Sequence, residues 1–208
     1  DVTLSINVDG TKSIISAAEI AGVNKIIFAS SAAVYGDCED VPISEGAPLI
    51  PQSPYAVSKI VGEELLLRSE IETCSLRFFN VYGPGQSSEG GYAAVIPAFK
   101  KAISLGKECT IFGDGTQVRD FVHVRDLVQI IASCLEAKNL PGEMNVASGT
   151  GVSLLELVET LNGLNPEMLP PVFAEERAGD IHTSVADISL LLSTLPVGEM
   201  IPLKEGLS

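Results

Sequence analysis

The 208-residue sequence has little positive charge for its size. It contains 13 lysines and arginines against 27 aspartates and glutamates, which gives a net charge of −14. A field of this sign repels phosphate groups unless cations are gathered locally, so we expect neither a nucleic-acid partner nor an anionic membrane partner. The few arginines are therefore informative as candidate ligand contacts.

Cysteine, histidine and long apolar runs are also scarce. The four cysteines, Cys38, Cys74, Cys109 and Cys134, form no C-x-x-C pair, which disfavours a zinc site, a redox dithiol and a disulfide framework. The two histidines lack ligand spacing, so no metal is expected. No apolar run approaches the roughly 18 residues that span a bilayer. We expect a soluble protein with free thiols in the cytoplasm.

Apolar residues make up 46% of the chain, enough for a sizeable core. Their spacing indicates alternating helices and strands, which is typical of a mainly parallel α/β sheet. Strands are predicted at residues 25–31, 76–80, 110–112, 121–124 and 144–146, and helices at residues 8–21, 54–70, 93–105, 126–135 and 153–161. A polar, glycine-containing loop at residues 86–91 marks the start of a second lobe.

A tyrosine and a lysine stand four residues apart in the helix predicted at residues 54–70. Tyr55 and Lys59 therefore share one helix face, where an ammonium lowers the pKa of a phenol and makes it a usable proton acceptor. A surface pair is the alternative, because the motif alone is weak. About two dozen residues upstream, Ser30 and Ser31 end a predicted strand. That strand end is expected to meet the start of the Tyr55 helix, where a serine hydroxyl can bridge substrate and phenol.

With these features the sequence resembles the extended short-chain dehydrogenases/reductases, in which a serine- or threonine-bearing strand end is followed by Y-x-x-x-K. The resemblance gives Ser31 the catalytic hydroxyl and Tyr55 the acid/base role. It gives Lys59 the tuning of Tyr55 and the binding of the nicotinamide ribose. The implied cofactor is NAD, with contacts from Asn7, Ser30, Tyr55, Lys59 and Phe79.

Further motifs occur in the family's order and extend the resemblance over nearly the whole chain. They include R-F-F-N-V-Y-G-P at residues 77–84, Y-A-A-V-I-P at residues 92–97, G-D-G-T-Q-V-R-D-F at residues 113–121 and E-R-A-G-D at residues 176–180. Guanidinium groups match phosphate geometry and carboxylates suit ribose hydroxyls, whereas surface ion pairs are the alternative for the arginines. The implied nucleotide-sugar contacts are Asn80, Ala94, Val95, Thr110, Phe112, Arg119, Arg177, Asp180 and Ser184.

The reaction implied by the resemblance is 4-epimerisation through a 4-keto intermediate with enzyme-bound NAD. Dehydratases and decarboxylases of the group usually carry an acid directly after the catalytic serine or threonine, where this sequence has Ala32 and Ala33. The motifs look most like those of 4-epimerases acting on UDP-glucose or UDP-N-acetylglucosamine. The small Ser184 is expected to leave space for an N-acetyl group. Alternatives are a truncated non-catalytic homologue that binds a nucleotide-sugar, a nucleotide-sugar reductase and a UDP-glucuronate epimerase.

The implied architecture is a truncated Rossmann-type parallel sheet with a smaller α/β substrate-binding lobe. Residues 1–85 are expected to form the C-terminal part of the NAD-binding domain. Residues 86–208 are expected to form mainly the substrate domain, with residues 121–148 returning to the first domain. No G-x-x-G-x-x-G follows a strand near the start, so we expect the amino-terminal glycine-rich segment to be absent. The resemblance also implies a homodimer through a four-helix bundle of the helices at residues 8–21 and 54–70.

Overall fold

A parallel three-stranded sheet organises the first part of the computed structural model, which describes residues 2–88, 94–177 and 179–208. Its strand order is β1 (Lys25–Ser31), β2 (Glu72–Phe78) and β6 (Glu143–Val146). Ser31 is in register with Phe78, and Phe78 with Val146. The carboxyl ends of all three strands therefore lie along one edge of the sheet, where open α/β sheets bind ligands.

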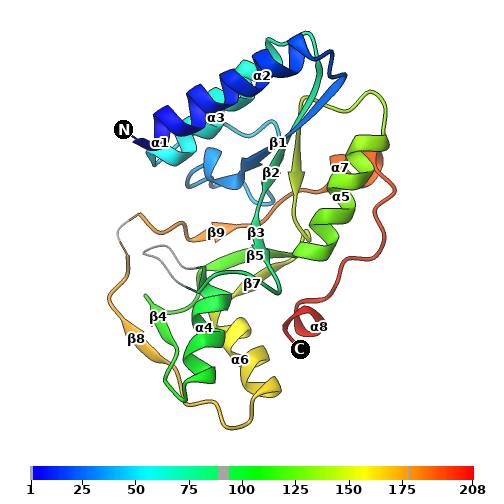
Figure 1. Ribbon diagram of the computed structural model, residues 1–208. Helices are drawn as coiled ribbons and strands as arrows, with labels where there is room; N and C mark the ends of the chain where they lie inside the picture. Colours follow the sequence, from blue (N-terminus) through cyan, green and yellow to red (C-terminus); the bar gives the residue numbers. More distant parts are fainter. Residues whose placement is uncertain (1, 89–93, 178) are drawn as a thin grey trace.

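One face of this sheet is covered by α3 (Pro54–Leu67), with α2 (Gly10–Ile20) alongside it (Figure 1). A short α1 (Val2–Leu4) and a π-helix, Ser5–Asp9, precede α2. The side chain of Ser53 accepts a hydrogen bond from the Ala56 amide at 3.1 Å, and Pro54 occupies the first turn of α3. This cap and proline fix where α3 begins, so Tyr55 lies beside the sheet's carboxyl edge.

The opposite face packs against α5 (Val124–Glu136) and α7 (Ser189–Thr194). Side chains alternate along β2: Cys74 and Leu76 enter this apolar layer, whereas Arg77 faces α3. The buried members of the layer are Cys74, Leu76, Leu127, Ile130, Cys134, Met144, Val146, Leu191 and Leu195. Within the described residues, every helix is too short or too polar to cross a bilayer.

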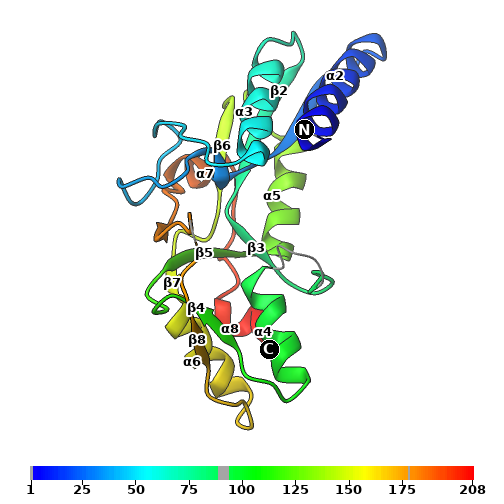
Figure 2. The same cartoon turned by 90° about the vertical axis from the view of Figure 1, so that its left-hand side faces the viewer.

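A second set of strands lies between the first sheet and the far end of the molecule (Figures 1 and 2). In it β5 (Val118–His123) pairs with β3 (Asn80–Tyr82) and β9 (Thr183–Ser184) in parallel and with β7 (Gly151–Ser153) antiparallel. A separate parallel pair consists of β4 (Thr110–Phe112) and β8 (Val172–Ala174). The two lobes therefore meet along β3 and β5.

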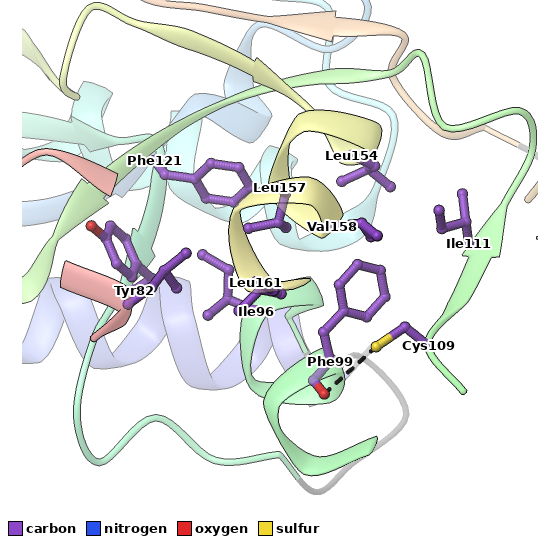
Figure 3. Close-up of a cluster of buried hydrophobic side chains, with 11 residues drawn as sticks. Tyr82, Ile96, Phe99, Cys109, Ile111, Phe121, Leu154, Leu157, Val158 and Leu161 are labelled. Carbon is purple, nitrogen blue, oxygen red and sulfur yellow. Dashed lines mark hydrogen bonds between the residues drawn. The ribbon is translucent and has the colours of Figure 1, made fainter. Parts of the chain in front are cut away.

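The second lobe has its own apolar core between α4 (Val95–Ser104), α6 (Leu154–Leu164) and α8 (Leu203–Leu207), shown in Figure 3. In that view the rings of Phe99 and Phe121 lie on either side of Leu157. At the start of α6, the Ser153 hydroxyl accepts from the Glu156 amide, and the Glu156 carboxylate accepts from the Ser153 amide. This reciprocal pair of hydrogen bonds is a capping box.

The strand prediction at residues 76–80 is wrong at both ends. The strand β2 starts at Glu72 and ends at Phe78, and Asn80 begins β3 in a different sheet. The Phe79 amide donates to the Val146 carbonyl at 3.0 Å while its ring enters a buried cluster, so tertiary contacts interrupt a continuous apolar pattern. Residue 93, where the next helix was expected to start, lies outside the described residues; α4 begins at Val95.

The mixed α/β architecture with parallel sheets agrees with the predicted fold class. Within residues 121–148, β6 and α5 pack with the first sheet. Among the described strands, the neighbouring β5 pairs only with those of the second set, and α7 returns to the first sheet from beyond that range. The domain boundaries given above stay predictions.

Gly36 and Gly22 both have left-handed backbone angles, at φ +63° and +69°, but only Gly36 is crowded. A Cβ on Gly36 meets the Ile50 carbonyl oxygen, whereas nothing lies within 4 Å of one on Gly22. We expect Gly22→Ala to lower the free energy of unfolding by about 1–2 kcal/mol. Gly36→Ala is expected to lower it by about 3 kcal/mol or more, because a backbone clash is added. Urea denaturation measures both, and equal losses contradict the steric argument.

Candidate active site

The predicted catalytic residues lie where β1 ends and α3 begins. Ser31 is the last residue of β1, and its hydroxyl oxygen accepts from the Ala33 amide at 3.2 Å, which starts a short 3-10 helix. Tyr55 lies in the first turn of α3 and is 42% exposed. A half-exposed phenol beside a strand end is accessible to a ligand.

Lys59 stands one turn after Tyr55 and links α3 to β1. Its ammonium nitrogen donates to the Ala29 carbonyl at 2.8 Å and lies 5.4 Å from the centroid of the Tyr55 ring. The same nitrogen is 5.1 Å from the Phe28 ring centroid. Burial lowers the pKa of Lys59 below its usual value. The structure thus brings Tyr55, Lys59 and the end of β1 together; their catalytic roles stay predictions.

The residues predicted to contact the cofactor have different surroundings. The Asn7 amide donates to the Ser58 hydroxyl at 2.8 Å, and that hydroxyl donates to the Tyr55 carbonyl at 2.7 Å, so Asn7 supports the start of α3. Ser30 is buried and its hydroxyl donates to Glu63. Phe79 is 6% exposed, with its ring centroid 6.4 Å from that of Tyr35. Only part of the predicted set is therefore at the surface of the site.

Most residues predicted to contact the substrate line one cavity of about 200 Å³ between α4 and the strands β3, β4 and β5. The lining residues that the sequence predicted are Asn80, Val95, Thr110, Phe112, Arg119, Arg177 and Asp180. Ala94 directly precedes α4, and Ser184 is in register with Arg119 on the neighbouring strand β9. Neither residue lines the cavity. The sequence did not single out Gln117, Phe99, Ala98 and Leu154, which complete the lining.

Arg119 is the most firmly held cation of this cavity. Its guanidinium donates to Asp180 Oδ1 at 2.6 Å, to the Val118 carbonyl at 2.9 Å and to the His182 carbonyl at 3.3 Å. The side chain is 14% exposed, and burial lowers the pKa of Arg119 while Asp180 opposes that shift. An arginine keeps its charge nonetheless. The ion pair with Asp180 fixes the orientation of the planar guanidinium group of Arg119.

A second cation lies over an aromatic ring of the same cavity. The guanidinium carbon of Arg177 is 3.9 Å from the centroid of the Phe112 ring, a cation–π geometry. Two arginines in one cavity supply the local positive charge that an acidic protein otherwise lacks. Guanidinium groups of this kind suit a diphosphate, with apolar residues such as Val95 left for a base.

Comparisons with known proteins identify the family of the chain. Residues 1–147 match the family described as "NAD dependent epimerase/dehydratase family". The UDP-glucose 4-epimerase of Azospirillum brasilense is 37% identical over 189 residues, which cover 80% of this chain and 53% of that protein. The chain spans between about half and two thirds of the length of the curated relatives it matches.

Two solved structures are similar over almost the whole chain. One is the UDP-N-acetylglucosamine 4-epimerase of Methanobrevibacter ruminantium M1 in complex with UDP-N-acetylmuramic acid, with a TM-score of 0.92 and 34% identity over 98% of this chain and 66% of that one. The other is the UDP-glucuronic acid 4-epimerase of Bacillus cereus in complex with UDP-glucuronic acid and NAD. Its TM-score is 0.87, with 31% identity over 98% of this chain and 65% of that one.

Asp120 is a buried acid beside Arg119 to which the sequence reasoning gave no role. Its carboxylate accepts from the Ser148 amide at 2.8 Å, the Ser148 hydroxyl at 2.7 Å, the Gly149 amide at 3.0 Å and the Ala186 amide at 3.3 Å. Burial raises the pKa of Asp120, and these hydrogen bonds oppose the shift. Asp120 therefore fastens two loops to β5 next to Arg119. An acid within the mostly buried strand β5 was the available signal.

We expect Asp120→Asn to lower the free energy of unfolding by about 1–3 kcal/mol, because an amide nitrogen then faces buried N–H donors. Ser148→Ala removes one donor and leaves the carboxylate its backbone partners, so its loss is expected to be smaller. Urea denaturation of both variants beside wild type measures the difference. A stability loss in Asp120→Asn no greater than that in Ser148→Ala contradicts the fastening role.

Proposed function

The chain belongs to the NAD dependent epimerase/dehydratase family, and on that premise we propose that the full-length protein is a UDP-sugar 4-epimerase. It interconverts UDP-glucose and UDP-galactose. The observation that carries this proposal is the cavity lined by Arg119, Arg177 and Asp180. Residues 78–80 connect this cavity to the carboxyl edge of the first sheet, where Ser31 lies. Phe78 is in register with Ser31, and Asn80, two residues later, already lines the cavity. One bound nucleotide-sugar can therefore place its diphosphate in the cavity and its sugar beside Ser31 and Tyr55.

The exposed edge beside β1 suits the nicotinamide end of NAD. Lys59 has three N–H donors, of which the Ala29 carbonyl accepts one, and the phenol of Tyr55 is accessible. These donors match ribose hydroxyls, so Lys59 and Tyr55 would hold the cofactor there. When bound, NAD supplies an acceptor and donor of hydride.

The chain's own residues handle the proton. Tyr55 takes the proton of the sugar 4-hydroxyl and later returns it, as a general base and then a general acid. The Lys59 ammonium, 5.4 Å from the Tyr55 ring centroid, favours the negative charge that develops on the phenol oxygen. The Ser31 hydroxyl accepts from Ala33 and can donate its own proton to the sugar oxygen.

Epimerisation is favoured over elimination by the residues after Ser31. Ala32 and Ala33 offer no carboxyl group at the position where the family's dehydratases usually carry an acid. A ketone formed at C4 therefore has no adjacent acid in this segment to drive loss of water. Reduction of the ketone on its other face is the proposed outcome, which inverts C4.

The substrate's remaining groups are assigned to the cavity residues. Arg119 and Arg177 bind the diphosphate, since planar guanidinium forks match phosphate oxygens. Asp180, which now accepts from Arg119, receives the ribose hydroxyls. Val95 and Phe112 lie where a uracil ring can pack.

A homodimer and a cytoplasmic location complete the proposal. Several apolar side chains of α2 and α3 are exposed, among them Ile14 at 65%, Ile20 at 89% and Leu67 at 74%. Burial of these faces in a four-helix bundle with a second copy removes them from water. The buried free thiols of Cys74, Cys109 and Cys134 suit a reducing compartment such as the cytoplasm.

Tyr55→Phe in the full-length protein is expected to lower kcat for UDP-galactose about 10²- to 10⁴-fold, because the proton acceptor is removed. Tyr82→Phe is the matched control: the Tyr82 hydroxyl is buried without a hydrogen-bond partner among the described residues, so its removal is expected to leave kcat unchanged. A coupled assay of UDP-glucose formation measures both. Near wild-type turnover by Tyr55→Phe removes Tyr55 from the mechanism.

We also propose that the enzyme accepts the N-acetylated pair, UDP-N-acetylglucosamine and UDP-N-acetylgalactosamine. Support comes from the small side chain of Ser184, which the family resemblance places beside the sugar C2 substituent. Ser184 is 9% exposed and lies next to Arg119 across β5 and β9. A larger side chain at this position therefore has to project toward the substrate region or displace its neighbours.

Ser184→Tyr is expected to suppress turnover of the N-acetylated pair and to spare UDP-glucose and UDP-galactose, because steric exclusion acts on the acetyl group alone. Ser184→Ala, which keeps the position small, is expected to retain both pairs. The ratio of kcat/KM values for the two substrate pairs measures this selectivity. Equal losses on both pairs in Ser184→Tyr, or no wild-type turnover of the N-acetylated pair, rule the assignment out.

A further inference from the structure

Three polar residues form a row across the first sheet, one position before its carboxyl edge. Ser30 of β1 is in register with Arg77 of β2, and Arg77 with Asn145 of β6. All three side chains are at most 4% exposed. Burial of a guanidinium in such a place is costly unless its charge and N–H groups are satisfied.

The charge of Arg77 is matched by Glu63 on α3. Arg77 Nη2 donates to Glu63 Oε2 at 2.7 Å and Arg77 Nε to Glu63 Oε1 at 3.1 Å, and the Ser30 hydroxyl donates to the same carboxylate. Burial alone disfavours the charge of Arg77, but its hydrogen bonds with Glu63 and Tyr35 raise its pKa above the usual value. Glu63 is thereby held against the sheet as an ion pair.

The position of Glu63 on α3 connects this pair to the proposed active site. Tyr55, Lys59 and Glu63 are spaced four residues apart, so they form one stripe along the helix. Lys59 lies between the other two and could pair with either neighbour. In the structure the Lys59 ammonium donates a hydrogen bond to the Ala29 carbonyl and lies near the Tyr55 ring, while Glu63 forms an ion pair with Arg77.

Among the described residues, the cavity beside Lys59 is lined by no other charged side chain. Within the described chain, the cavity beside it is lined by Asn7, Gly10 and Thr11 together with apolar side chains from the π-helix, α2, β1 and α3. Of the described groups, Glu63 is therefore the anion placed to compete for Lys59, and Arg77 is the cation that occupies it.

We propose that Arg77 is a positioning residue that keeps Lys59 beside Tyr55 by holding Glu63 in a competing ion pair. This role rests on the proposed function of Tyr55 and Lys59. Arg77 touches neither substrate nor cofactor in this scheme. It also donates to the Tyr35 hydroxyl at 3.0 Å and the Glu45 carbonyl at 2.9 Å, which anchors the segment after Ser31.

The decisive comparison is between Arg77→Met and the double variant Arg77→Met/Glu63→Gln in the full-length protein. In the single variant Glu63 is left without its cation and draws Lys59 away from Tyr55. We expect kcat for UDP-galactose to fall about 10²-fold, as for a small misplacement of a catalytic group, and the acid limb of the kcat–pH profile to move to higher pH. The double variant lacks the competing charge, so its acid limb is expected to return toward wild type.

Lys25→Met is the matched control for a merely structural loss. Lys25 pairs with Glu72 at 3.5 Å at the opposite end of the same two strands and is 13% exposed. We expect it to lower stability while leaving the acid limb in place. An unmoved limb in Arg77→Met, no recovery in the double variant, or an equal shift in Lys25→Met overturns the proposal. If Arg77→Met does not fold, Arg77→Gln replaces it and is expected to show the same shift.

Amide hydrogen exchange separates this inference from the proposed function. Residues 54–60 are expected to exchange faster in Arg77→Met than in wild type, with no such change in Lys25→Met, whether or not the protein turns over a UDP-sugar. Absence of wild-type epimerase activity refutes the proposed function alone. Unchanged exchange at residues 54–60 in Arg77→Met refutes the positioning role.

Discussion

The buried pairing of Arg77 with Glu63 is the interaction on which the arrangement of the first lobe depends. A guanidinium in the interior has to be surrounded by acceptors, and here they come from α3, from Tyr35 and from the Glu45 carbonyl. Tyr35 in turn donates to Asn145, so the requirement spreads across the third strand. A single buried charge thus fixes the strand ends, α3 and the following loop relative to one another.

The second lobe is organised by one strand, β5, that serves two purposes. Arg119 and Asp120 are adjacent on it and point to opposite sides: Arg119 lines the cavity, and Asp120 holds the loop at residues 148–149 and the Ala186 amide. The alternation of a strand therefore puts a ligand-facing cation and its structural support on neighbouring residues. Because β3 pairs with β5 directly after β2 ends, the cavity is tied to the edge that carries Ser31.

Local signals in the sequence predicted some elements correctly and could not reveal others. The strand predicted at residues 25–31 depends on neighbouring residues alone, and this prediction is confirmed. The break at Phe79 and the two-residue β9 depend on pairing with distant strands, which no local pattern contains. Motif resemblance named seven residues that line one cavity, and their ligand contacts stay predictions. Arg77 was passed over, since its partner Glu63 is recognisable only once α3 is docked.

The contacts of Ile43 have a consequence for synthesis of the chain on the ribosome. Its amide donates to the Val185 carbonyl, its carbonyl accepts from the Asp187 amide, and Asn145 bonds to both Ile43 and Asp187. The loop that follows β1 therefore completes its hydrogen bonds only after residue 187 has been made. Until then a nascent chain carries an incomplete polar layer, so this lobe closes only after residue 187 is made, well after synthesis of β1 and β2.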